Sequence, residues 1–165
     1  MIETVYQLVT RNMEGVYAGR TALRWYDEQR QAVVEKRYGD YAREIRCAVT
    51  SLREKIPDLV GRNICILSGN NYSHAVNVFA LMLAGAVVVP LNQNKSWDEL
   101  EYELDLIQPA AVLWDGGDYP YREDLVRRMA GRTATVRSAS RRGRSASGAA
   151  ALCWGIIRTP RPRPR

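Results

Sequence analysis

The feature that most constrains the fold is a regular alternation of helical and strand patterns after residue 40. Three short, almost entirely apolar runs are typical of strands buried on both faces of a sheet, and they occupy residues 63–67, 86–89 and 110–114. Helical patterns precede and separate them, at residues 40–56, 72–84 and 96–107. Because the connections are short, this order predicts an α/β fold, a small parallel sheet with helices on its faces.

The ends of these elements carry recognisable signals. Asp40 is the expected N-cap of the first helix, whose core-facing side contains Tyr41, Ile45, Ala48, Val49, Leu52 and Ile56. Gly85 is expected to end the second helix in a left-handed turn, and Pro90 is expected to close the strand that follows. The sequence Ser96-Trp-Asp-Glu99 is a capping box that predicts the start of the third helix.

Three further elements are expected outside this region. Residues 2–13 have apolar positions spaced for one face of a short helix. Residues 21–26 and 33–38 are rich in β-forming residues and predict a hairpin across a polar loop. Residues 121–129 are expected to begin a last helix.

Charge divides the chain into an acidic body and a basic tail. Residues 1–125 contain 13 lysines and arginines against 18 acidic residues, whereas residues 126–165 contain 11 arginines and no lysine, aspartate or glutamate. Of these last 40 residues, 29 are Arg, Ala, Ser, Gly or Pro. Such a segment has too little apolar material to order itself, so we expect one body over 1–125 and a disordered Arg-rich tail over 126–165.

Three interpretations of the tail remain open at this point. Eleven arginines suit a nucleic-acid arm, because guanidinium groups bind phosphate. They also suit an anchor on an acidic membrane surface. A third interpretation, which we favour, is an out-of-frame product, because a GC-rich gene translated in the wrong frame yields mainly Arg, Ala, Gly and Pro.

Nothing at the start of the sequence indicates secretion or membrane insertion. The first residues lack a basic segment and an apolar run, so we expect a cytoplasmic protein with reduced thiols. The longest apolar stretch, residues 75–91, contains Asn77, Gly85 and Pro90. It is therefore interpreted as a helix followed by a strand, and no membrane span is expected.

Several residue types could carry chemistry, but each has a plainer structural explanation. The single histidine, His74, is expected to be an ordinary residue near a helix start rather than a catalytic base. Cys47 and Cys65 are both expected in the core. The acidic residues of the third helix predict a solvated face rather than a metal site, and the tryptophans predict packing; these residues are Asp98, Glu99, Glu101, Glu103, Asp105, Trp25, Trp97 and Trp114.

The order of four motifs resembles the start of the AMP-forming acyl-adenylate synthetases, which include acyl-CoA synthetases, adenylation domains and luciferases. The motifs are Tyr38-Gly-Asp-Tyr41, the strand and turn at residues 61–71, Leu83-Ala-Gly-Ala-Val-Val-Val-Pro-Leu-Asn92, and the helix that begins at Ser96. The resemblance covers residues 38–114. Leu83 stands where the family usually has lysine, at a position expected on the helix surface.

The resemblance implies a ligase that converts ATP and a carboxylate, fatty acids included, into an acyl-adenylate and pyrophosphate. A thiol, usually that of coenzyme A, then takes the acyl group. ATP, Mg²⁺ and coenzyme A are thus implied for the full-length family. The family's phosphate loop is rich in Ser, Thr and Gly and ends in lysine, but Lys36, Lys55 and Lys95, the only lysines here, follow no such loop.

We therefore expect an N-terminal fragment of this ligase family that is inactive alone. No catalytic, cofactor-binding or metal-binding residue is assigned to this chain. A separately encoded C-terminal chain that completes the enzyme is one possible partner. The alternative is a small α/β binding module whose basic tail contacts nucleic acid or an acidic membrane, the nucleic-acid role depending on a genuine tail.

Overall fold

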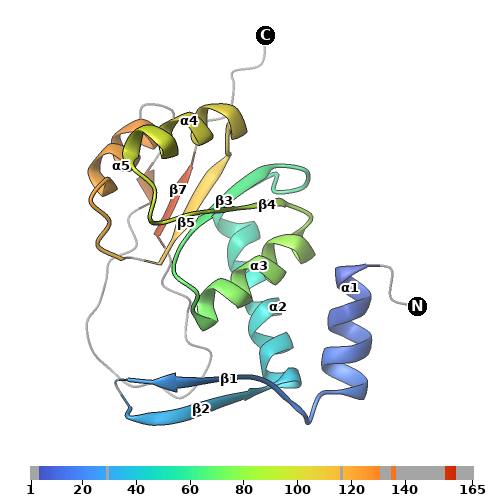
Figure 1. Cartoon of the computed structure of the whole chain (residues 1–165). Coiled ribbons are helices and arrows are strands. Elements are labelled where there is room, and N and C mark those ends of the chain that lie inside the picture. The colour runs from blue at the N-terminus through green and yellow to red at the C-terminus, as the bar shows by residue number, and fades with distance from the viewer. Residues whose placement is uncertain (1–3, 29, 116, 131–134, 137–154, 159–165) are drawn as a thin grey trace.

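A computed structural model of the protein describes residues 4–28, 30–115, 117–130, 135–136 and 155–158 (Figure 1). A short helix and a π-helix lead into a two-stranded hairpin, after which helices and strands alternate as expected. The elements in chain order are α1 (Val5–Gln7), η1 (Leu8–Val16), β1 (Thr21–Asp27), β2 (Ala32–Arg37), α2 (Tyr38–Lys55), β3 (Asn63–Leu67), α3 (Tyr72–Ala84), β4 (Val87–Leu91), α4 (Trp97–Ile107), β5 (Ala111–Trp114), α5 (Arg122–Ala130), β6 (Thr135–Val136) and β7 (Gly155–Arg158).

Five strands form the main sheet in the order β4-β3-β5-β7-β6. β3 lies between β4 and β5 and runs parallel to both. This confirms the parallel α/β arrangement expected from the alternating pattern. On the far side of β5, β7 and β6 add an antiparallel edge that the pattern did not predict.

The side chains of β3 alternate between the two faces of the sheet, as successive residues of a strand must. Ile64 and Ile66 pack into one core with α2 and α3, while Cys65 and Leu67 pack into a second core with α4 and α5. All four side chains are completely buried. Helices therefore cover both faces of the sheet, which gives the three layers seen in Figure 1.

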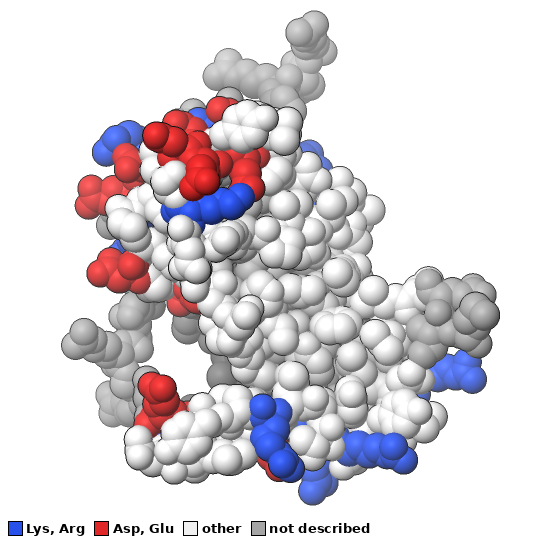
Figure 2. Space-filling model, viewed as in Figure 1, with Lys and Arg blue, Asp and Glu red and all other residues white. Residues whose placement is uncertain are grey.

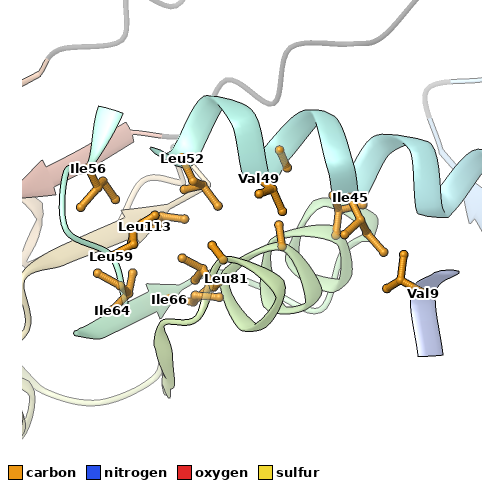
Figure 3. Close-up of a cluster of buried hydrophobic side chains, with 14 of the residues drawn as sticks. Val9, Ile45, Val49, Leu52, Ile56, Leu59, Ile64, Ile66, Leu81 and Leu113 are labelled. Atoms are coloured by element: carbon orange, nitrogen blue, oxygen red, sulfur yellow. The ribbon is translucent and has the colours of Figure 1, made fainter. Parts of the chain in front are cut away.

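The first core is the larger one, and Figure 3 shows its centre. α2 lays one apolar side along it, with Ile45, Val49 and Leu52 at helical spacing. Leu81 of α3 lies beside Ile66 of β3 in the same view. Ordinary helical periodicity thus places α2 and α3 against the central strand.

Aromatic contacts fasten the β1–β2 hairpin to this core. The ring of Trp25 stacks on Tyr72 with centroids 5.1 Å apart and an interplanar angle of 14°. Tyr72 in turn meets Tyr41 at 5.9 Å. Lys36 lies 5.4 Å from the centre of the Tyr72 ring and pairs with Glu44 at 2.6 Å. The expected packing role of Trp25 is therefore confirmed.

Element ends agree with the sequence signals at three helices. Gly85 has φ +87°, the left-handed conformation expected where α3 ends. Ser96 and Glu99 form both hydrogen bonds of the capping box at the start of α4. α5 also occupies the expected position. These signals are local, so the sequence alone was sufficient to place them.

Two end signals were wrong. α2 begins at Tyr38 directly after β2, so Asp40 lies in its first turn and is not its N-cap; a carboxylate there still favours the helix dipole. β4 continues through Pro90, which is paired in register with Ile66. Because β4 is an edge strand, its proline can turn its missing N–H outward, and Val87 and Pro90 are exposed rather than buried.

α5 continues past residue 125. Leu125 and Met129 lie one helical turn apart on α5 and are both buried in the second core. Farther along the tail, the described residues include two short strands, β6 and β7. Thr135, Val136, Ile156 and Ile157 are β-branched, which favours strand formation at an open sheet edge. The other tail residues after Ala130 lie outside the described residues.

No helix in the described ranges is both long and apolar enough to cross a membrane.

Candidate functional site

The carboxyl ends of the parallel strands form the candidate functional site. Because they are parallel, β3, β4 and β5 all end on the same side of the sheet, and the connections over residues 68–71, 92–96 and 115–121 follow them there. The helix after β3 packs on one face, whereas the helices after β4 and β5 pack on the other. Open α/β sheets bind ligands where neighbouring connections diverge in this way.

Asp115 joins the loops at this edge. Its Oδ2 accepts hydrogen bonds from the Gly69 amide at 3.1 Å and from Asn71 Nδ2 at 3.3 Å. Its Oδ1 accepts from the Gly117 amide at 3.0 Å and from the Tyr119 hydroxyl at 2.8 Å. Both carboxylate oxygens are thus occupied by donors, so the arrangement suits Asp115 for holding loops together and not for accepting a proton from a substrate.

The third loop crosses toward the end of β4. The Tyr121 hydroxyl donates to the Gln93 carbonyl at 2.8 Å, and the Tyr119 hydroxyl lies 3.3 Å from Gln93 Oε1. The two tyrosine rings stack with centroids 5.8 Å apart. Burial, together with the negative charge of Asp115, raises the pKa of Tyr119 well above its usual range. Its hydroxyl therefore keeps its proton and remains a donor to Asp115 at neutral pH.

His74 lies in the first turn of α3, as the sequence predicted. Its Nδ1 is 2.7 Å from the hydroxyl of Ser68, a buried residue at the end of β3. Its backbone amide donates to Asn71 Oδ1 at 2.8 Å, which caps the helix. These contacts connect the strand end to the following helix and give a structural explanation for the single histidine.

The other candidates are dispersed over the molecule. Cys65 is buried, as predicted, but the prediction for Cys47 was wrong because that residue is exposed. Cys47 lies two residues from both Ile45 and Val49, which at 100° per residue places it opposite the buried side of α2. Among the described residues, no group of three or more His, Cys, Asp or Glu side chains could hold a metal ion.

The acidic residues of α4 form ion pairs and a cap. Glu99 belongs to the capping box, and Glu103 pairs with Lys95. Arg128 of α5 pairs with Glu101 at 3.0 Å and also with Asp105. The tryptophans of this side pack as expected: Trp97 and Trp114 are partly buried against the second core, and Arg122 covers the Trp114 ring.

Three residues of this site were not predicted as site residues from the sequence: Gln93, Asp115 and Tyr119. A usable signal was present, because a polar residue directly follows each of the three apolar strands: Ser68, Asn92 and Asp115. What the sequence could not supply was the pairing, since the bond between Gly69 and Asp115 joins residues 46 positions apart.

Replacing Asp115 by alanine should lower the free energy of unfolding by about 2 kcal/mol, because four donors lose a charged acceptor in a partly buried network. Urea unfolding followed by circular dichroism measures the change. Asp118→Ala is the matched control, since Asp118 is exposed in the same loop and should change stability by less than about 0.5 kcal/mol. Equal effects of the two substitutions would show that the Asp115 network does not stabilise this edge.

Comparison with known proteins relates this architecture to adenylate-forming enzymes. No family model matches the chain. The chain is 37% identical over 73 residues to 4-coumarate–CoA ligase-like 9 of Arabidopsis thaliana, a match that covers 44% of this chain and 13% of that protein. The chain thus spans only a small part of the length of this relative.

Solved structures show the same fold. Klebsiella oxytoca NpsA in complex with 3-hydroxyanthranilyl-AMSN matches with a TM-score of 0.62 at 18% identity, over 72% of this chain and 23% of NpsA. The inhibitor-bound N-terminal domain of FACL13 from Mycobacterium tuberculosis matches with a TM-score of 0.61 at 19% identity, over 76% of this chain and 30% of that one. These comparisons confirm the resemblance to the N-terminal part of AMP-dependent synthetases and ligases.

Proposed function

We propose that the chain supplies the first part of the large domain of an AMP-forming acyl-CoA ligase or adenylation enzyme in the cytoplasm. The complete enzyme would join a carboxylate to ATP, releasing pyrophosphate, and then pass the acyl group from AMP to a thiol. The observation that carries this proposal is the 37% identity to a CoA ligase-like protein over 73 residues. The match of the sheet and its helices to adenylation enzymes supports it.

We propose that this chain is inactive alone, and the surroundings of its lysines and of Asp115 support the proposal. Lys36 and Lys95 pair with Glu44 and Glu103, and neither lies in a glycine-rich loop that could cradle phosphates. Asp115, the carboxylate at the strand ends, is already surrounded by four donors. The phosphate-binding and catalytic groups of the complete enzyme would then come from other polypeptide.

The test is carboxylate-dependent exchange of pyrophosphate into ATP. We expect no exchange by this chain alone. Exchange should appear when the full chain is co-expressed with the part of the Arabidopsis relative that follows its matched segment, referred to below as the C-terminal remainder. The substrate panel should contain 4-coumarate, 3-hydroxyanthranilate and straight-chain fatty acids, because the names of the similar proteins include 4-coumarate, 3-hydroxyanthranilyl and a long-chain-fatty-acid CoA ligase.

The C-terminal remainder expressed alone is the control, and it should show background exchange only. Exchange by this chain alone would contradict its proposed inactivity. A stable complex of the two chains without exchange on any acid of the panel would contradict the proposed ligase function.

A further inference from the structure

One face of the molecule carries almost no charge. The chain contains no Asp, Glu, Lys or Arg between Arg62 and Lys95, a stretch of 32 residues that includes all of α3 and β4. Figure 2 shows the result as a broad white surface over these two elements. Acidic and basic side chains gather above it over α4 and below it near the hairpin.

The outward side of α3 is apolar although it is not buried. Met82 is 44% exposed, and four other apolar side chains of the helix are only partly covered: Ala75, Val78, Phe79 and Leu83. Leu83, expected on the surface, is in fact half-buried against the first core. By contrast, α2 covers its outer side with Arg43, Arg46, Arg53 and Glu54. A helix that is apolar on nearly all sides is typical of a helix buried between two layers.

Three exposed apolar side chains lie at one corner, where β4 begins. Val60 is 76% exposed and Val87 is 48% exposed. The Gly61 amide donates to the Gly85 carbonyl at 2.8 Å, and the Gly85 amide donates to the Met82 carbonyl at 3.1 Å. These bonds bring the two turns together, so Val60, Met82 and Val87 form one patch, here called the β4 corner.

β4 also leaves one of its long edges without a neighbouring strand on this face. In the described part of the chain, β4 pairs only with β3. The Val87 amide donates to the Arg62 carbonyl at 2.9 Å on the β3 side, so the backbone groups of Val88 must point away from the sheet. Pro90 also faces outward and has no N–H, so the open edge can pair with another strand only through the N–H and C=O of Val88 and the C=O of Pro90.

We propose that the α3–β4 face is the docking surface for the C-terminal part of an adenylate-forming domain carried on a separate polypeptide, which adds a strand to the outer edge of β4. This inference rests on the proposed function. The occupant is chosen because the solved chains that share this fold are much longer, with only 23% and 30% of them covered by this chain. They therefore contain ample polypeptide to cover an uncharged face.

The test is co-purification of the tagged full chain with the C-terminal remainder, followed by light scattering for the mass of the complex. We expect a one-to-one complex. Met82→Glu and Val87→Lys should each weaken it at least about tenfold, because each places a charge in an apolar interface. Both side chains are about half exposed in the free chain, so urea unfolding should show little change in its stability.

Tyr102→Glu is the matched control, because Tyr102 is 69% exposed on α4, outside the α3–β4 face, and its substitution should leave the affinity unchanged. Binding should also persist between about 0.1 and 1 M NaCl, whereas binding through the arginine tail would weaken steeply. A complex that resists both charged substitutions, a salt-sensitive complex, or a homodimer that excludes the remainder would each overturn the proposal.

The outcomes also separate this proposal from the proposed function. Pyrophosphate exchange that survives Met82→Glu and Val87→Lys would reject the docking surface and retain the ligase function. A complex that both substitutions disrupt, but that shows no exchange, would retain the docking surface and reject the ligase function.

Discussion

Replacing Leu81 by alanine should lower the free energy of unfolding by about 3 kcal/mol. Leu81 is fully buried in the first core, beside Ile66 of the central strand. The substitution removes three carbon atoms from a fully buried site, and surrounding side chains relax only partly into such a cavity. Urea unfolding followed by circular dichroism gives the change directly.

The neighbouring residue provides a matched control on the same helix. Met82 is 44% exposed, so Met82→Ala should change the free energy of unfolding by less than about 0.5 kcal/mol. Similar losses for the two substitutions would mean that α3 does not pack against the sheet as described. A large difference would also show that Met82 contributes little to the isolated chain, which agrees with a role for it in docking.

Elements whose signals come from residues close together in the chain were predicted correctly. The capping box at Ser96 and Glu99 and the left-handed turn at Gly85 are formed by residues within a few positions of each other, and both were predicted. β3 was also predicted, because a short run of consecutive apolar residues is typical of a strand buried on both faces. Features of this kind depend on neighbouring residues, so they can be predicted from a short stretch of sequence.

Features that depend on partners distant in the chain were missed. The role of Asp115 depends on Gly69 and Asn71, which precede it by more than 40 residues. β4 was expected to be buried because its residues are apolar. Full burial of a strand also requires a neighbouring strand on each side, and in the described residues β4 has only β3 beside it. The apolar composition of β4 thus fits the docking face better than the interior of this sheet.

Raising the pH above 9 should destabilise the protein through Cys65. Burial, with a smaller contribution from the negative charge of Glu103, raises the pKa of the Cys65 thiol from its ordinary value of 9.0 to about 12. The folded state therefore keeps a proton that the unfolded state loses between pH 9 and 12. Stability from this group is complete below pH 9 and falls by about 1.4 kcal/mol per pH unit above it, or about 4 kcal/mol by pH 12.

Buried Tyr41 should add a second loss above pH 10, because burial raises its pKa well above the ordinary value of 10.0. A variant comparison isolates the cysteine: Cys65→Ala should be less stable at pH 7 but should lose about 1.4 kcal/mol less per pH unit above pH 9. The test is urea unfolding at half-unit pH steps under reducing conditions. Cys47→Ala should retain the wild-type slope, since Cys47 is exposed. If Cys65→Ala also retained the wild-type slope, the thiol could not be buried between the sheet and α4, and the second core described above would be wrong.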